Sequence, residues 1–155
     1  MVTLHAEANR NVTKITLEGV PDRPGIAAEI FGTLGNQGYN IELVVSTGGE
    51  GGRADISFGV SRTEEEAVLR ALETIRDEVG ARALHANSNV ALVSIVGQHL
   101  STEPGIAGRM FTALSKTGIN IEIISTSMSS VTCLIEEART EEALGALREE
   151  FGLPA

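Results

Sequence analysis

The sequence predicts an α+β protein of two similar units, each an antiparallel sheet of four strands with two helices on one face. The first observation behind this prediction is an internal repeat. Residues 24–42 match residues 104–122 in one register, and ten of the nineteen positions are identical. The second observation is that strand and helix patterns follow in the same order in both halves. The chain therefore holds two copies of one unit, and its function lies in that unit or in its pairing.

A short apolar segment precedes each unit and also repeats. Leu4-His5-Ala6 returns as Leu84-His85-Ala86. A strand at 83–87 can close the sheet of the first unit, whereas the second unit ends at its last helix. We therefore expect the first unit to span residues 12–87 and the second to combine residues 2–7 with residues 88–155. In this arrangement the N-terminal strand completes the second sheet.

The first unit begins with a predicted strand at 12–20, where apolar and polar residues alternate. Residues 21–25 contain two prolines and a glycine, which interrupt the strand. Apolar residues then keep helical spacing from Ile26 until glycines end the pattern at 35–38. Strand, turn and helix thus follow one another directly.

A hairpin is predicted after this helix. Ile41, Leu43 and Val45 have the spacing of one face of a strand, and residues 56–60 have it again. The glycine-rich segment 48–52 lies between them and predicts a flexible connection. The order up to this point is strand, helix, strand, strand.

The second helix of the unit is predicted after Thr63. Thr63 with Glu66 fits a capping box, and residues 68–79 carry one apolar stripe. Strand 83–87 completes the order βαββαβ, which gives the ferredoxin-like arrangement, whose exposed sheet edges favour side-by-side pairing. The second unit repeats this order, with strands near 90–97, 120–126 and 131–137 and helices near 104–117 and 140–150.

The composition excludes several classes of function. The formal net charge is −9 and no basic stripe is present, which argues against nucleic acid and anionic membranes as partners. A single cysteine, Cys133, cannot form an internal disulfide, and no apolar run suits a signal peptide or a membrane span. We expect a cytoplasmic protein with an aliphatic core and no cofactor.

The chain is not expected to be an enzyme. It has no Walker loop, because the lysine and helix that a phosphate loop needs do not follow the glycines at 48–52. His5, His85 and His99 are isolated in the sequence, which disfavours metal binding and acid–base catalysis. Cys133 alternates within an apolar strand and is most simply a core residue.

The most informative candidate site is the junction between the first strand and the first helix. Pro24-Gly25 opens that helix, whose first N–H groups lack intrahelical partners, and Gly25 has no Cβ to keep a carboxylate away. Asn40 and Asn120 precede strands, and their amides both donate and accept hydrogen bonds. Together these features suit an amino acid as ligand. Taken singly, each is also typical of an ordinary structural turn.

These motifs resemble those of a known family. Asp-Arg-Pro-Gly-Ile-Ala at 22–27 and Gly-Tyr-Asn-Ile at 38–41 are similar to the ACT domain, a ferredoxin-like module that binds small metabolites, commonly amino acids, at domain interfaces. Residues 11–25, 53–67 and 118–151 resemble more closely the tandem ACT region of aspartate kinase. With the first ACT strand close to its start and no kinase domain, the chain resembles the free-standing regulatory (β) subunit, which assembles with a catalytic α subunit.

The resemblance implies feedback control of the first step of the aspartate pathway, the phosphorylation of aspartate by ATP, by threonine and often lysine. In this family the threonine pocket lies between the first ACT unit and the second ACT unit of a partner chain, so a homodimer is expected. The effector-binding residues would then be Asp22, Pro24, Gly25, Ile26, Ala27, Asn40, Ser46, Asn120 and Ile121. Ser46 departs from the longer amide side chain that related chains often carry.

The second unit differs from the first at its helix start. Thr102-Glu103 stands where the first unit has Asp22-Arg23. The carboxylate of Glu103 would lie near the place of a ligand carboxylate, which disfavours a ligand at this second helix start. We therefore expect the two units to have different roles in ligand binding.

Two other functions fit the same residues. One is a free-standing tandem ACT protein that binds amino acids and acts as a regulatory adaptor away from any kinase. The other is a purely structural dimerisation module, which predicts no ligand. Co-purification of a kinase subunit tests the first alternative, and a thermal-shift screen of the amino acids tests the second.

Overall fold

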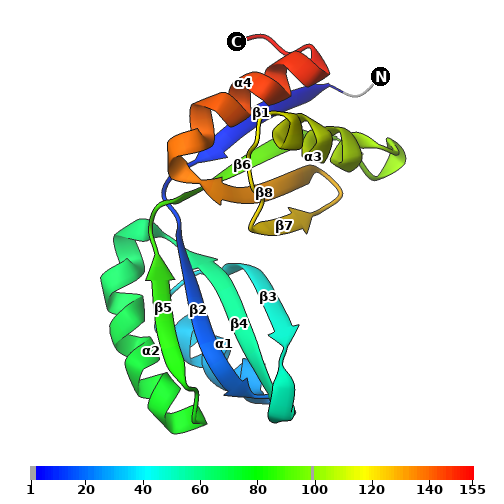
Figure 1. Ribbon diagram of the computed structural model, residues 1–155. Helices are drawn as coiled ribbons and strands as arrows, with labels where there is room; N and C mark the ends of the chain where they lie inside the picture. Colours follow the sequence, from blue (N-terminus) through cyan, green and yellow to red (C-terminus); the bar gives the residue numbers. More distant parts are fainter. Residues whose placement is uncertain (1–2, 99) are drawn as a thin grey trace. The chain divides into compact units, whose positions relative to one another are not determined.

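The computed structural model describes residues 3–98 and 100–155, which form two compact units (Figure 1). The first unit spans residues 11–88, and the second combines the N-terminal segment up to Arg10 with residues 89–155. Each unit holds one antiparallel sheet of four strands and two α-helices. The predicted α+β class with two ferredoxin-like units is confirmed. Val2, where the predicted N-terminal strand begins, lies outside the described residues.

The sheet of the first unit has the strand order β3-β4-β2-β5, with β4 and β2 at its centre (Figure 1). Its strands are β2 (Thr13–Pro21), β3 (Glu42–Gly48), β4 (Arg53–Val60) and β5 (Ala83–Asn87). Its helices are α1 (Ile26–Asn36) and α2 (Glu65–Val79). Helix α1 continues through Gly35, which the sequence pattern places at its end.

Both helices of the first unit pack on one face of the sheet, because their apolar stripes meet the same side of the strands. Ile15 and Leu17 of β2 are fully buried on that side, as the alternation predicts. The helical members of this core are Ile26, Ile30 and Leu34 of α1 and Val68, Leu72, Ile75 and Val79 of α2. Burying one such side chain contributes about 1.5–3 kcal/mol, and the fully buried Phe58 of β4 packs with these aliphatic residues in the same core.

The sheet of the second unit has the order β1-β6-β8-β7. Its strands are β1 (Leu4–Asn9), β6 (Val90–Gly97), β7 (Ile123–Thr126) and β8 (Ser130–Glu136), and its helices are α3 (Ile106–Lys116) and α4 (Thr140–Phe151). The N-terminal strand β1 pairs with β6 from Leu4 opposite Gly97 to Asn9 opposite Leu92. Cys133 is fully buried in this unit's core, as predicted.

Strand β3 departs from the predicted alternation. Leu43 has a left-handed backbone with φ 58°, and the pairing with β4 shifts register between Glu42 and Val45. A bulge of this kind inserts a residue and reverses which side chains face the core beyond it. Val45 therefore lies opposite Ser57 and is 36% exposed, and Val44, within the bulge, is 51% exposed. The predicted alternation, in which Val45 shares one face of the strand with Ile41 and Leu43, is therefore wrong at Val45.

The predicted capping box at Thr63 is also wrong. A short 3-10 turn at Arg62–Glu64 precedes α2, and the helix begins at Glu65 without a side-chain cap. The Thr63 hydroxyl instead shares a hydrogen bond of 2.8 Å with the Ser61 hydroxyl. The Thr63 N–H donates to Asn11 Oδ1 at 3.3 Å. These nearer partners replace the reciprocal bonds that a capping box requires.

Strand β7 begins at Ile123 and not near residue 120. The preceding segment 119–122 is held by isolated bonds, from the Ile119 N–H to the Leu114 carbonyl at 3.0 Å and from the Glu122 N–H to the Leu134 carbonyl at 2.8 Å. Asn120 and Ile121 therefore lie in a connection between α3 and β7. Within the described residues, no helix is long and apolar enough to cross a membrane.

Candidate functional site

The start of α1 presents a set of backbone donors. The Ile26 N–H donates to the Arg23 carbonyl at 3.2 Å, and no side chain caps the helix. The N–H groups of Ala27 and Ala28 have no acceptor within the helix because they belong to its first turn. Gly25 has φ 88°, a left-handed conformation that glycine adopts without strain. This junction is therefore suited to bind an anionic group at the positive end of the helix dipole.

The end of the sheet brings further predicted residues to this junction. The Asp22 N–H donates to the Gly52 carbonyl at 2.8 Å, which ties the loop before α1 to the hairpin between β3 and β4. Ser46 of β3 lies opposite Ile56, a core residue on the face that carries the helices. Ile56 pairs with Leu17 in the middle of β2, whereas Pro21 pairs with Arg53 at the end that leads to Gly25, so Ser46 lies on the helix-bearing face, between the middle of the sheet and that end.

Most side chains around the junction are open to solvent. Asp22, Pro24, Gly25, Ala27 and Ser46 are exposed, whereas Ile26 is buried in the core and fixes the first turn of α1. The guanidinium of the neighbouring residue 23 pairs with Glu29 at 2.7 Å and so folds along the helix. The described structure thus leaves the backbone donors of the junction accessible to a small molecule.

Asn40 lies at the opposite end of α1 from Gly25. Helix α1 has eleven residues and is therefore about 16 Å long at 1.5 Å per residue. Asn120 has the equivalent position after α3, where its side chain is exposed and makes no hydrogen bond to the described residues. Ile121, beside it, packs against the core of the second unit. Within one unit, an amino acid cannot touch both the helix start and the asparagine, so Asn40 and Asn120 stay predictions.

The second unit has a hollow at its own helix start, which the sequence does not predict. Gly105 repeats the left-handed conformation of Gly25, with φ 91°, and α3 again lacks a side-chain cap. The hollow has a volume of about 250 Å³ and is lined by Leu100, Glu103, Gly105, Ile106, Ala107, Thr126, Ser127 and Val131. Glu103 thus contributes to its wall, in agreement with the expectation that its carboxylate lies near this helix start.

Two of the three histidines, His5 and His85, lie on edge strands. His5 of β1 is 3.5 Å from Glu7, and His85 of β5 is 2.9 Å from Glu18. His99 lies outside the described residues. Among the residues that are described, no group of three or more His, Cys, Asp or Glu side chains is placed to hold a metal ion.

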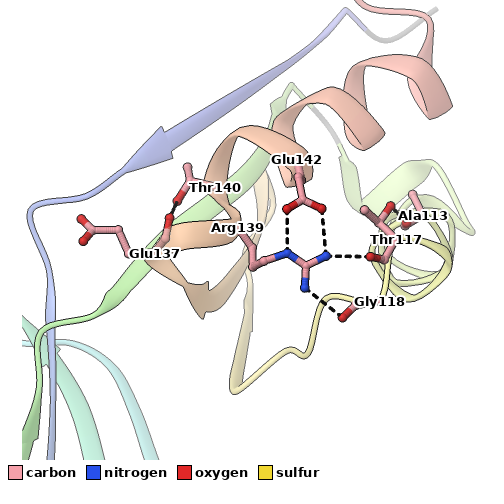
Figure 2. Close-up of polar contacts among 7 residues, drawn as sticks. All are labelled: Ala113, Thr117, Gly118, Glu137, Arg139, Thr140 and Glu142. Carbon is pink, nitrogen blue, oxygen red and sulfur yellow. Dashed lines mark hydrogen bonds and ion pairs between the residues drawn. The ribbon is translucent and has the colours of Figure 1, made fainter.

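A polar cluster that sequence reasoning missed joins the two helices of the second unit (Figure 2). Arg139 donates to both carboxylate oxygens of Glu142, each at 2.9 Å, and to the carbonyls of Thr117 at 2.8 Å and Gly118 at 3.3 Å. The hydrogen bond from Arg139 lowers the pKa of the Glu142 carboxyl, and the same bond raises the pKa of Arg139. Both changes favour the charged pair. The signal in the sequence is the repeated Arg-Thr-Glu-Glu at 62–65 and 139–142.

Comparison with known proteins places these features in a family. The profile of the ACT domain matches residues 15–80, and a second ACT domain profile matches residues 93–151. Aspartate kinase of Pseudomonas fluorescens is 40% identical over 147 residues, which are 95% of this chain and 36% of the relative. The chain therefore spans about a third of the length of such curated relatives.

Two solved structures match over nearly their full length. The regulatory subunit of aspartate kinase from Thermus thermophilus, in a ligand-free form, superposes with a TM-score of 0.90 and 33% identity, and the match covers 97% of this chain and 98% of that one. A structure of aspartokinase alpha and beta subunits gives a TM-score of 0.91 and 33% identity, covering 99% of this chain and 100% of the matched chain.

Proposed function

The chain belongs to the regulatory subunits of aspartate kinase, which carry two ACT domains in tandem, and from this premise we propose that it binds threonine and mediates feedback inhibition of a catalytic kinase subunit. The 155 residues correspond to the regulatory region of the matched kinases and not to their catalytic domain. One observation carries the proposal above the others: the match to the regulatory subunit from Thermus thermophilus covers 97% of this chain and 98% of that one.

The chemistry of the α1 junction supports an amino acid as effector. A carboxylate fits the uncapped N–H groups of the first turn of α1, and Asp22 in the same exposed loop supplies an anion for an ammonium group. A Cβ built on Gly25 would meet nothing within 4 Å, so the space in front of the loop is open. Ser46 adds an exposed hydroxyl from β3, on the sheet face that carries the helices. Threonine has a carboxylate, an ammonium group and a hydroxyl, one for each of these partners.

The proposed pocket is completed by a second copy of the chain. The partner subunit's Asn120 and the partner subunit's Ile121 would close it, with the amide of the asparagine as a further hydrogen-bonding group. Supporting this, Asn120 is exposed and makes no hydrogen bond to the described residues of its own chain. A ligand that binds only the assembled form stabilises that form by mass action, so threonine should tighten a homodimer. Threonine would act in the cytoplasm as an end product of the pathway whose first step the kinase catalyses. Lysine would act on the complex of regulatory and catalytic subunits.

Co-expression with a catalytic aspartate kinase subunit tests this function. The tagged chain should retain the untagged catalytic subunit through purification, and threonine should inhibit aspartate phosphorylation only in the complex. Retention without any effect of threonine or lysine would contradict the sensing role. Failure to retain the catalytic subunit, together with amino-acid binding by the chain alone, would favour the regulatory adaptor.

A further inference from the structure

The turn that precedes Asn120, residues 117–118, is fixed by a side chain from a distant part of the second unit. Arg139 ends the 3-10 turn Glu137–Arg139, directly before α4, and its guanidinium reaches the carbonyls of Thr117 and Gly118 after the end of α3 (Figure 2). Those carbonyls are 21 and 22 residues away in the sequence. The contact therefore links the start of one helix to the end of the other.

The Thr117 carbonyl, at the C-cap of α3, is a group that a helix end leaves without a partner, and the Gly118 carbonyl follows it directly. Helix α3 ends at Lys116, and the last carbonyls of a helix have no N–H donor in the next turn. A cation at this end also interacts favourably with the negative end of the helix dipole. Arg139 satisfies both requirements, because one planar side chain supplies donors in a fixed fork.

Glu142 holds the guanidinium in the orientation that the carbonyls need. Its two carboxylate oxygens accept parallel bonds of 2.9 Å from Nε and from one terminal nitrogen of Arg139. That terminal nitrogen also donates to the Thr117 carbonyl, and the other donates to the Gly118 carbonyl. Bidentate pairing of this kind fixes geometry as well as charge. The Arg139 side chain is only 29% exposed, which limits competition from water.

The segment next to this contact carries the residues proposed to touch the effector. Gly118, with φ 77°, turns the chain out of α3, and Ile119 is then buried in the core at 5% exposure. Asn120 follows without regular secondary structure and without a hydrogen bond to the described residues. Its position is therefore set by its neighbours: the anchored turn at 117–118, buried Ile119 and packed Ile121.

We infer that Arg139, oriented by Glu142, is a positioning residue for effector binding, which fixes the turn 117–118 so that Asn120 meets the effector without an ordering cost. The inference rests on the proposed function only in its effector part. Loosening the turn leaves Asn120 to be ordered when the ligand binds, and ordering one such segment weakens affinity about three- to tenfold.

Two neighbouring glutamates provide a matched test. Glu142→Gln disturbs the bonds to Arg139, whereas Glu141→Gln disturbs the pair that Glu141 makes with Arg10 at 2.6 Å. Both residues lie in the first turn of α4, so each substitution removes one negative charge from the same helix end. Any difference between the two variants therefore reports the contact with the 117–118 turn. Arg139→Ala and Arg139→Lys complete the set, because lysine keeps the charge but loses the fork.

The first readout needs no effector. Amide hydrogen exchange of residues 117–122 in the intact chain should accelerate in Arg139→Ala and Glu142→Gln, remain at the wild-type rate in Glu141→Gln, and be only partly restored by Arg139→Lys. Exchange in β6 and β8 reports global unfolding and should accelerate much less than exchange of residues 117–122, which separates a local effect from global destabilisation. Unchanged exchange of residues 117–122 in Arg139→Ala overturns the inference.

The second readout is threonine affinity by isothermal titration. Arg139→Ala and Glu142→Gln should each lose about three- to tenfold, and Glu141→Gln should bind as the wild type does. If the wild type binds threonine and Arg139→Ala binds it equally well, the positioning role is overturned while the proposed function stands. If the wild type binds no threonine, the proposed function and the effector part of this inference both fall, and accelerated exchange still identifies Arg139 as the anchor of the turn.

Discussion

Gly25 and Gly105 hold the same left-handed backbone conformation, with φ 88° and φ 91°, at the starts of equivalent helices in the two units. Neither helix has a side-chain cap, so both expose the N–H groups of their first turn. The residues around them differ, because Asp22-Arg23 precedes the first helix start and Thr102-Glu103 the second. One repeated backbone site thus carries two different charge environments.

Gly25→Ala and Gly105→Ala should cost similar stability and differ in effector binding. A Cβ at either position meets nothing within 4 Å, so only the left-handed backbone is penalised, by about 1–2 kcal/mol in each case. Thermal unfolding should therefore show equal losses. Threonine titration should show weaker binding for Gly25→Ala alone, because its methyl group lies beside the proposed carboxylate. An equal loss of affinity in both variants would argue against a site at the first helix start.

Asn120→Ala should weaken threonine binding without unfolding the chain. Its side chain is exposed and outside the sheet, and a lost hydrogen bond to a charged ligand costs about 1.5–3 kcal/mol, or roughly ten- to a hundredfold in affinity. In a reconstituted kinase, the threonine concentration needed for inhibition should rise by the same factor, with little loss of basal activity.

Asn40→Ala is the matched comparison for Asn120→Ala. Asn40 lies at the far end of α1 from Gly25, so we expect a smaller effect on threonine binding than Asn120→Ala produces. Inhibition curves that shift for Asn40→Ala and not for Asn120→Ala would reverse the assignment of the partner's contribution to the pocket.

The strand and helix patterns are predictable from the sequence because burial imposes their periods. Ile15 and Leu17 alternate along β2, and the apolar stripe of α2 recurs at helical spacing, so each element shows which face it buries. The bulge at Leu43 has no such signature, since one inserted residue shifts the register of β3 without changing its composition. The local pattern also predicts a capping box at Thr63 that does not form, because the Thr63 hydroxyl is hydrogen-bonded to the Ser61 hydroxyl instead.

The candidate site is only partly predictable for a different reason. The backbone N–H donors at the start of α1 are predictable from a local motif, Pro24-Gly25. The recurrence of this motif in the second unit indicates that it is a defined feature of the repeat. The contact between Arg139 and the Thr117 carbonyl joins residues 22 positions apart and depends on how α3 and α4 pack. No local spacing rule anticipates such a contact, although the repeated Arg-Thr-Glu-Glu marks the residue.

The stabilising contribution of Glu142 should disappear in acid. Its bond to Arg139 lowers its pKa below the ordinary value of 4.5, so the contribution is complete above that value and is lost as the pH falls through the lower folded-state pKa. Melting temperatures of the wild type and Glu142→Gln should differ by a constant amount at pH values well above 4.5 and converge as the pH falls through the lowered folded-state pKa of Glu142. A difference that persists unchanged to the acid limit would show that charge pairing is not its cause.

Cys133 should be unreactive in the folded chain. Burial raises the pKa of its thiol to about 12, so almost no thiolate exists at pH 8 and the sulfur is also shielded. A thiol reagent should label the native chain only as fast as it unfolds. Cys133→Ser should destabilise by about 1–3 kcal/mol, because the hydroxyl would be buried opposite Val93 without a partner, and Cys133→Ala serves as the control for lost volume. Rapid labelling of the native chain would contradict this burial.

The central claim, an amino-acid effector site completed by a second copy of the chain, is tested most directly by titrating threonine into the isolated protein while its association is followed by sedimentation. A ligand of this size gains at most about 1.5 kcal/mol per heavy atom, and ordering losses should leave micromolar to millimolar affinity. The account predicts saturable heat in that range and a homodimer whose dissociation constant falls as threonine is added. No heat at ten millimolar threonine, or a dissociation constant that threonine leaves unchanged, would contradict it.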